Sequence, residues 1–239
     1  ESSAASDVYK RQDNGVLARS KEVYDPQTDA WYWFEADGTM ARDKDVFIVL
    51  NADGTGKWTR YDSDGRMVKG ESYKNGAWYY FDTATGKMAH GKYYRDGAYY
   101  YYDTATGIMQ YGEQTIDGDE YYFDTETGAM VTGEVERDGR YYYYDDETGA
   151  MLGLGEQIVK YAEKFLGTPY TWGGTSPDTG FDCSGFTQYV YSNFGIDLDR
   201  TSSAQRRQGE AVDEDDIMPG DLVCYLSLIH ISEPTRLAL

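Results

Sequence analysis

The chain has 239 residues and a formal net charge of −20, because 42 Asp and Glu outweigh 22 Lys and Arg. A chain this acidic is a poor partner for nucleic acids or for anionic membrane surfaces, so neither is expected. No apolar run is long enough to cross a bilayer, and the first seven residues lack the apolar core of a signal peptide. The two cysteines do not make a disulfide framework, whereas 25 Tyr and 27 Gly indicate repeats.

Residues 1–27 are polar and mixed, and they are interpreted as a lead-in or as part of an earlier repeat, since the chain does not begin with Met. From Trp31 onward a pattern begins that settles to a period of 21 residues. The residues that keep this step are Gly65, Gly86, Gly107, Gly128 and Gly149, together with Met67, Met88, Met109, Met130 and Met151. The segment 43–48, DKDVFI, interrupts the step and predicts a longer or bulged unit.

Each repeat predicts a β-hairpin. Asn75-Gly76 and its counterparts separate two short runs, and such pairs favour hairpin turns because both residues tolerate positive φ. The second run is aromatic, as in WYYFD (78–82), and aromatic residues suit strands. One hairpin of this size cannot bury its own face, so neighbouring hairpins must stack. An all-β hairpin-repeat solenoid is therefore expected over residues 28–152.

Residues 28–152 resemble the choline-binding and glucan-binding family of cell-wall repeats. The matching motif is G-x-x-x-[ND]-G-x-[WY]-Y-Y-[FY]-D followed by T-G-x-M-x-x-G. For the choline-binding branch, the resemblance implies an aromatic cage between repeats that holds a quaternary ammonium by cation–π attraction. The chain departs from that pattern, because the position after the first glycine of each repeat is not aromatic: Glu71, Lys92, Glu113 and Glu134. Glucan, teichoic acid or another wall polymer is thus at least as strongly expected as choline.

The candidate contacts to a wall polymer are aromatic residues of the repeated runs: Trp78, Tyr80, Tyr99, Tyr101, Tyr122, Tyr141 and Tyr143. Any single ring among them is more simply explained as part of the core, and the periodic methionines as core fillers. His90 occupies a variable position of the repeat and is not interpreted as a site residue.

The period ends at Gly153-Leu154-Gly155, and apolar residues then recur at helical spacing from 158 to 166. A loop rich in Gly and Pro leads to Cys183, which begins a second predicted helix that ends near Asn193. A helix N-terminus carries a partial positive charge that favours the thiolate, and the thiolate is the nucleophilic form of cysteine. Cys224 lies within the predicted strand 222–225 and is interpreted as a small core residue.

Residues 156–225 resemble the NlpC-type family of cell-wall cysteine peptidases. The motifs that carry the resemblance occur in the family's order: FLGTPYTWGG (165–174), GFDCSGF (180–186), Arg200-Thr201-Ser202 and PGDLV (219–223). The resemblance implies an α+β papain-like fold and cleavage of peptidoglycan peptides, typically at γ-D-glutamyl bonds to a diamino acid, without a metal or cofactor. It also implies residue roles, with Cys183 as nucleophile and Tyr170, Asp182 and Ser184 lining the substrate cleft. Tyr170 or the Cys183 N–H would then bind the oxyanion.

A catalytic cysteine of this kind needs a histidine base, which the family places on strands after PGDLV. His230 falls near that place, but LSLIHISEPTR (226–236) resembles a translated transposase adapter from sequencing libraries. Pro234 also argues against a central strand. Residues 226–239 are therefore interpreted as an adapter artefact and the peptidase domain, 153–225, as incomplete. Without the missing strands, the first helix is expected to have no apolar surface to cover, and the chain to be inactive and poorly folded beyond about residue 155.

The predicted function is that of a secreted or cell-wall-associated peptidoglycan hydrolase. In this hypothesis the repeats bind wall glycans or teichoic acid, and the cysteine domain cuts stem peptides. The alternative is a non-catalytic wall-binding or adhesin module with a vestigial cysteine domain, and a third reading is acyl transfer by the same nucleophile. A histidine downstream of the PGDLV strand would favour the enzyme over the binding module.

Overall fold

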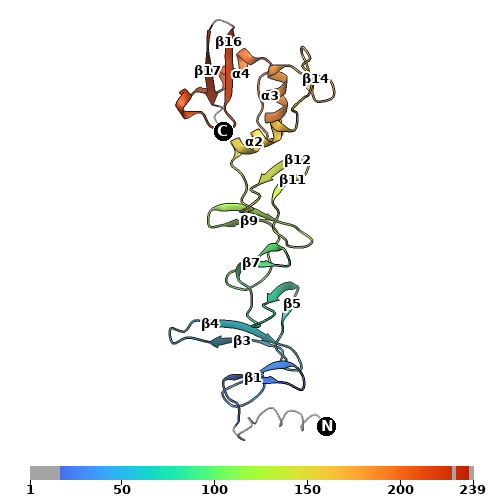
Figure 1. The fold of residues 1–239 in the computed structure, drawn as a ribbon, viewed down its shortest axis with the longest axis vertical. Coiled ribbons are helices and arrows are strands. Elements are labelled where there is room, and N and C mark those ends of the chain that lie inside the picture. Colours follow the sequence, from blue (N-terminus) through green and yellow to red (C-terminus); the bar gives the residue numbers. More distant parts are fainter. Residues whose placement is uncertain (1–16, 228–229, 237–239) are drawn as a thin grey trace. The chain divides into compact units, whose positions relative to one another are not determined.

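The computed structural model describes residues 17–227 and 230–236. Its contacts divide the chain into two compact units, one made of residues 1–112 with 123–130 and the other of residues 113–122 with 131–239. Figure 1 shows a series of β-hairpins followed by a region of helices and strands, which confirms the predicted two-part class. Within the described residues, no helix combines the length and the apolar character needed to span a membrane.

The repeat region consists of antiparallel hairpins. Their strands are β1 (Lys21–Asp25) with β2 (Ala30–Phe34), β3 (Lys44–Val49) with β4 (Gly56–Tyr61), β5 (Gly70–Lys74) with β6 (Ala77–Phe81), β7 (Gly91–Arg95) with β8 (Ala98–Tyr102), β9 (Gly112–Ile116) with β10 (Asp119–Phe123), and β11 (Gly133–Arg137) with β12 (Arg140–Tyr144). The turn of β5–β6 shows the predicted geometry, since Asn75 has φ 54° and Gly76 has φ 82°. Burial differs between the two faces of β6, because Phe81 is fully buried whereas Trp78 is exposed.

The structure differs from the expectation at the start of the array. Part of the segment interpreted as a lead-in, residues 21–25, forms strand β1, while residues 1–16 lie outside the described residues. Tyr24 pairs directly with Trp31 across the hairpin. The sequence signal was weak because the turn of this hairpin contains neither Asn-Gly nor Asp-Gly.

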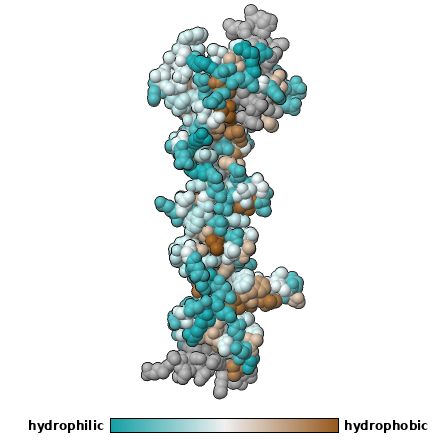
Figure 2. All heavy atoms as spheres, turned by 180° about the vertical axis from the view of Figure 1, so that it is seen from behind, coloured by the Kyte–Doolittle hydropathy of each residue, from teal (hydrophilic) through white to brown (hydrophobic). Residues whose placement is uncertain are grey.

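The interruption at residues 43–48 corresponds to a longer hairpin, as predicted. Strands β3 and β4 have six residues each, whereas the strands of the next hairpins have five. Phe47, Val49, Leu50 and Trp58 of this hairpin are exposed apolar residues. Figure 2 shows this hairpin as the projecting apolar surface low in the view.

The periodic methionines and glycines lock neighbouring hairpins together. The Met88 N–H donates to the carbonyl oxygen of Trp58, in the preceding hairpin, at 2.8 Å, and the Met109 N–H donates to Trp78 at 2.9 Å. The glycine of each following repeat lies against such a methionine. A Cβ atom at Gly107 would lie 2.5 Å from the Met88 sulfur. The period of 21 residues therefore reflects contacts between hairpins as well as the hairpin turns.

Gly86→Ala is expected to destabilise the array more than Gly76→Ala. Both positions have positive φ, but a Cβ at Gly86 would meet the Met67 side chain, whereas the space at Gly76 is open. The shared backbone strain costs about 1 kcal/mol or more, and overpacking at Gly86 adds about 1–3 kcal/mol. Urea denaturation of the two variants measures the difference, and equal losses would contradict the packing role of Gly86.

In the part of the chain after residue 153 that the structure describes, there are three helices and several short strands. The helices are α2 (Leu154–Glu163), α3 (Cys183–Ser192) and α4 (Ser202–Gln208), and a 3₁₀ turn, η1, spans Glu214–Asp216. The strands are β13 (Thr175–Ser176), β14 (Gly180–Phe181), β15 (Glu210–Ala211), β16 (Leu222–Ser227) and β17 (His230–Arg236). The predicted helices and the predicted strand 222–225 are thus present, the latter as part of β16.

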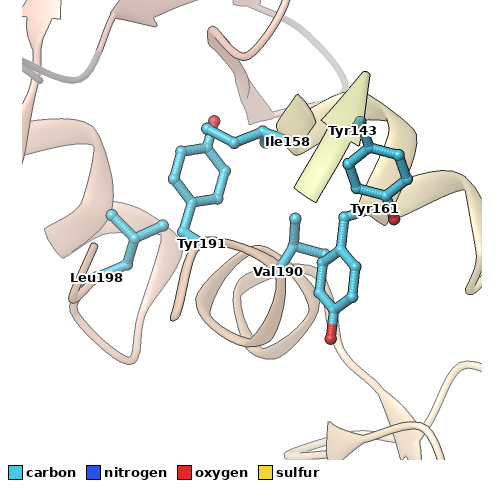
Figure 3. Close-up of a cluster of buried hydrophobic side chains, with 6 residues drawn as sticks. All are labelled: Tyr143, Ile158, Tyr161, Val190, Tyr191 and Leu198. Carbon is cyan, nitrogen blue, oxygen red and sulfur yellow. The ribbon is translucent and has the colours of Figure 1, made fainter. Parts of the chain in front are cut away.

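The helices and the last hairpin share one apolar core. Its buried residues, drawn in Figure 3, are Tyr143 of β12, Ile158 and Tyr161 of α2, Val190 and Tyr191 of α3, and Leu198. The expectation that the first helix would lack an apolar surface is therefore wrong, because α3 and β12 supply that surface. Gln157 of α2 adds polar contacts, since its side chain accepts from the Tyr143 N–H at 3.3 Å.

The expectation that Pro234 excludes a central strand is also wrong. The order of the three-stranded sheet is β15-β17-β16, so β17, which contains Pro234, lies in the middle. The pairing with β15 covers only Thr235 and Arg236, whereas Pro234 pairs only with Val223 of β16. At Pro234 the strand thus has a partner on one side, where a residue without an N–H is tolerated.

Candidate functional site

Cys183 is the first residue of α3, and its side chain is exposed. The residue before it, Asp182, caps the helix by accepting from the Gly185 N–H at 2.7 Å. The second oxygen of the Asp182 carboxylate accepts from the Gly173 N–H at 3.0 Å, which ties the preceding loop to the helix start. A Cβ atom at Gly185 would collide with the carbonyl oxygen of Gly174. The glycine of the DCSG motif thus lets this loop pack directly on the first turn.

Arg200 clamps the cap of α3. Its guanidinium donates to both oxygens of Asp182, at 3.0 and 2.6 Å, and to the hydroxyl of Ser184 at 3.0 Å. The Arg200 hydrogen bonds, followed by the bond from the Gly185 N–H, hold the pKa of the Asp182 carboxyl far below its usual range. Arg200 belongs to a motif of the sequence but has no predicted role, because its partner, Asp182, lies 18 residues earlier.

Ser202 is the residue whose side chain lies next to the thiol. Its hydroxyl oxygen is 3.2 Å from the Cys183 sulfur. Helix α4, which begins at Ser202, is held against α3 by the buried Gln205. The Gln205 amide donates to the Ser184 carbonyl at 2.9 Å and accepts from Thr187 at 2.8 Å. The position of the Ser202 hydroxyl is therefore set by packing between the two helices.

The other predicted cleft residues also lie near Cys183. Asp182 and Ser184 are its neighbours in the sequence, and Tyr170 is brought near by backbone pairing. Tyr170 forms a bridge with Phe181, two residues before Cys183, and its side chain is 66% exposed. Ser184 is buried, and its hydroxyl contacts Asp182 and Arg200. In this structure Asp182 and Ser184 thus serve to shape the helix start, while Tyr170 is free to meet a ligand.

For His230, the candidate base, the structure describes the backbone alone. His230 is the first residue of β17 and its backbone pairs with Ser227 of β16. Its side chain lies outside the described part of the chain, as do the other side chains from residue 225 onward.

The two cysteines are expected to differ in reactivity. Burial raises the pKa of the Cys224 thiol, so less thiolate is present at neutral pH, whereas Cys183 is exposed. Under native conditions iodoacetamide should therefore alkylate Cys183 at least about tenfold faster. Peptide mass spectrometry over a time course measures both rates, and faster labelling of Cys224 would contradict this assignment.

Exposed aromatic pairs form a second candidate site on the repeats. Trp78 is 41% exposed and lies 5.1 Å, between ring centroids, from Tyr73 on the paired strand. Tyr99 is 39% exposed and lies 4.9 Å from Tyr94 in the same arrangement. Trp78 and Tyr99 are among the predicted contacts, whereas their tyrosine partners, which the strand register places directly opposite, are not.

The remaining predicted rings are covered to different degrees. Tyr80 and Tyr122 each face an arginine guanidinium, and Tyr101 stacks on Phe123 with 6.0 Å between centroids. Tyr141 lies 5.4 Å from Tyr161 of α2, and the neighbouring Tyr143 is buried in the shared core. These rings contribute packing in the structure described here.

These features define a class of two-part chain, in which hairpins that expose aromatic pairs are followed along the sequence by a domain where an exposed cysteine begins a helix. Comparison with known families agrees with this class. Residues 167–232 match the NlpC/P60 family, and residues 54–93 and 110–153 match the choline-binding repeat. The chain therefore carries an NlpC/P60 domain preceded by choline-binding repeats.

Several curated proteins are similar to the NlpC/P60 part. The chain is 52% identical over 68 residues to a probable endopeptidase p60 of Listeria seeligeri, covering 28% of this chain and 13% of that protein. It is 43% identical over 70 residues to the bifunctional muramidase/DL-endopeptidase CwlT of Bacillus subtilis, and 44% identical over 70 residues to a γ-D-glutamyl-L-lysine dipeptidyl-peptidase of Bacillus cereus. These two matches each cover 29% of this chain and 21% of the relative.

Among solved structures, choline-binding protein F of Streptococcus pneumoniae is similar to the repeats. It is 31% identical with a TM-score of 0.50, and the match covers 58% of this chain and 43% of that one. A structure of CbpF in complex with ipratropium gives 28% identity and a TM-score of 0.51, covering 59% and 49%. These likenesses support the hairpin-repeat fold.

Proposed function

We propose that this chain derives from a cell-wall hydrolase in which Cys183 attacks peptide bonds of peptidoglycan stem peptides. The observation that supports this best is the exposed thiol at the first turn of α3, within the segment that matches the NlpC/P60 family. The name of the similar Bacillus cereus enzyme, a γ-D-glutamyl-L-lysine dipeptidyl-peptidase, favours γ-D-glutamyl bonds as the substrate class. Because the matches cover a minor part of each relative, the activity of the whole protein is part of the proposal.

In the proposed reaction the Cys183 thiolate attacks the scissile carbonyl carbon, and collapse of the tetrahedral intermediate releases the amine and leaves a thioester. Water then hydrolyses the thioester and frees the thiol. The backbone N–H of Cys183, at the start of α3, can stabilise the oxyanion, whereas the Gly185 N–H of the same turn already donates to Asp182. Asp182 and Arg200 act as positioning residues that fix this turn. A histidine must take the thiol proton and deliver a proton to the leaving amine.

We further propose that residues 226–239 replace the natural segment that carries this histidine, so that the printed chain is inactive. Strand β17, with His230 at its start, would then occupy the place of the natural strand. The family match extends to residue 232 and so includes His230, and the test must therefore ask whether His230 acts as the base.

The test compares two proteins on purified peptidoglycan. One is the printed chain, and the other carries the C-terminal sequence read from source DNA without transposase adapters. Mass spectrometry of released peptides should detect cleavage by the restored chain alone. Cleavage by the printed chain that His230→Ala removes would overturn the artefact proposal. A restored chain that binds walls without releasing peptides would favour the alternative, a non-catalytic wall-binding module.

For the repeats we propose binding of a wall glycan through the exposed aromatic pairs, which places the protein outside the cell or on the wall. Flat rings such as those of Trp78 and Tyr99 suit stacking on sugar faces, and both are accessible. The net charge of −20 opposes binding of a phosphate polymer such as teichoic acid.

Sedimentation with cell walls tests this part. The double variant Trp78→Ala/Tyr99→Ala should lower the bound fraction about tenfold, whereas Trp172→Ala, which removes an exposed ring outside the repeats, should leave it unchanged. Walls stripped of teichoic acid should still bind the chain. Loss of binding on stripped walls would instead make teichoic acid the ligand.

A further inference from the structure

Arg95 lies between aromatic rings of two neighbouring hairpins. Its guanidinium carbon is 3.9 Å from the ring centroid of Tyr100, in its own hairpin, and 4.8 Å from that of Tyr80, in the preceding hairpin. The same group donates to Glu71 at 2.7 Å and to the Tyr102 hydroxyl at 3.1 Å. Only 9% of the Arg95 side chain is exposed. Rings on two sides and a carboxylate on a third form a site for a cation, and Arg95 fills it.

The same arrangement recurs two repeats later. The Arg137 guanidinium carbon lies 4.1 Å from the Tyr122 ring and 4.2 Å from the Tyr142 ring. It donates to Glu113 at 2.7 Å and to the Tyr144 hydroxyl at 2.9 Å. Every member of the second set follows its counterpart by 42 residues, twice the repeat. Because the same five residues make the same contacts in two copies, the arrangement is not an accidental contact.

The repeat between them shows that the acid and the arginine change together. The position of Glu71 and Glu113 holds Lys92 there, and the position of Arg95 and Arg137 holds Ile116. Where the carboxylate is absent, the arginine is absent as well.

A third carboxylate at this position is also neutralised from within the chain. Glu134, in the last repeat, accepts from Lys164 at 2.7 Å, and the Lys164 ammonium lies 3.4 Å above the Tyr141 ring. Each glutamate that follows the first glycine of a repeat thus has an internal cation placed over tyrosine rings.

We propose that Arg95 and Arg137 are built-in cations that close the aromatic sites between hairpins to choline-like ligands. A tethered guanidinium competes at a high effective concentration, so a free quaternary ammonium cannot displace it. Recognition is then left to the uncharged exposed pairs, such as Tyr73 with Trp78. The inference rests on the proposal that the array binds a wall ligand, and it adds that this ligand is not recognised through a cation in these two sites.

Isothermal titration calorimetry with choline and with tetramethylammonium tests the inference on the full chain. Arg95→Ala should open one site and raise the affinity for both probes at least tenfold over the unaltered chain. Lys74→Ala is the matched control, because Lys74 holds the same place in the preceding hairpin and its ammonium contacts the Asp43 carbonyl. The double variant Arg95→Ala/Glu71→Gln should lose most of the gain, since it removes the carboxylate of the site.

Arg137→Ala tests the second site by the same measurement of choline affinity. If Arg95→Ala unfolds the chain, the result for Arg137→Ala tests the inference. Absence of a gain in a folded arginine variant, or choline binding by the unaltered chain that neither substitution changes, overturns the inference. Wall sedimentation of the same proteins separates the two proposals. If the chain sediments with walls but the arginine variants bind choline no more tightly, the proposed wall binding stands and the built-in cation is rejected. If the arginine variants bind choline more tightly but the chain does not sediment with walls, the built-in cation stands and the proposed wall binding is rejected.

Discussion

The substitution Cys183→Ala, made in a chain with its natural C-terminal segment, is expected to reduce peptidoglycan hydrolysis by more than about 1,000-fold. The reason is that the thiol is the proposed nucleophile, and the other groups at the helix start can stabilise charge but cannot form the thioester. Folding should be unaffected, because the Cys183 side chain is exposed. The measurement is the rate of stem-peptide release, with thermal unfolding as the check on folding.

Two further variants control this experiment. Cys224→Ala should keep most of the activity, because Cys224 is interpreted as a core residue of β16. Ser202→Ala should change the rate less than tenfold, since the Ser202 hydroxyl contacts the sulfur without taking part in bond formation. If activity survives Cys183→Ala but is lost in Cys224→Ala, the nucleophile is Cys224 and the assignment of Cys183 is wrong.

Arg200→Ala is expected to destabilise the NlpC/P60 region and to lower hydrolysis by the restored chain more than about tenfold. The substitution removes two charge-assisted bonds to Asp182 and the bond to Ser184, so the turn that carries Cys183 loses its clamp. The loss of stability is moderated because 39% of the Arg200 side chain is exposed. Arg207→Ala is the matched control, since the exposed Arg207 donates to Ser203 of its own helix.

The effect of Arg200→Ala should depend on pH in a defined direction. The pKa of Asp182 is lowered by the Arg200 hydrogen bonds and by the bond from the Gly185 N–H. A lowered pKa stabilises the fold fully above the ordinary aspartate value of about 3.9, and this stabilisation is lost as the pH falls toward the folded-state pKa. The difference in unfolding temperature between the unaltered chain and Arg200→Ala should thus stay constant from pH 5 to 8 and shrink at lower pH. A difference that grows in acid would contradict the role assigned to Asp182.

Much of the architecture was predictable because its signals are local. The Asn-Gly and Asp-Gly turns impose positive φ on two adjacent residues, and the aromatic runs that follow them have the alternation of a strand. The start of α3 was predictable for the same reason, since the capping residue, Asp182, and the tight glycine, Gly185, lie within three residues of each other. These local signals are enough to predict the hairpin repeats, the helix after the loop, and the cysteine at its first turn.

Residues far apart along the chain complete these elements, and the folded structure is needed to identify them. Arg200 reaches Asp182 across 18 residues and Arg95 reaches Glu71 across 24, and no local pattern at either arginine shows which residue its partner is. The last hairpin was read as one more repeat, but Tyr143 lies in a core with α2 and α3, because those helices offer it an apolar surface that no local pattern describes. Long-range packing and charge pairing depend on which surfaces meet in space, and that is fixed only when the chain has folded.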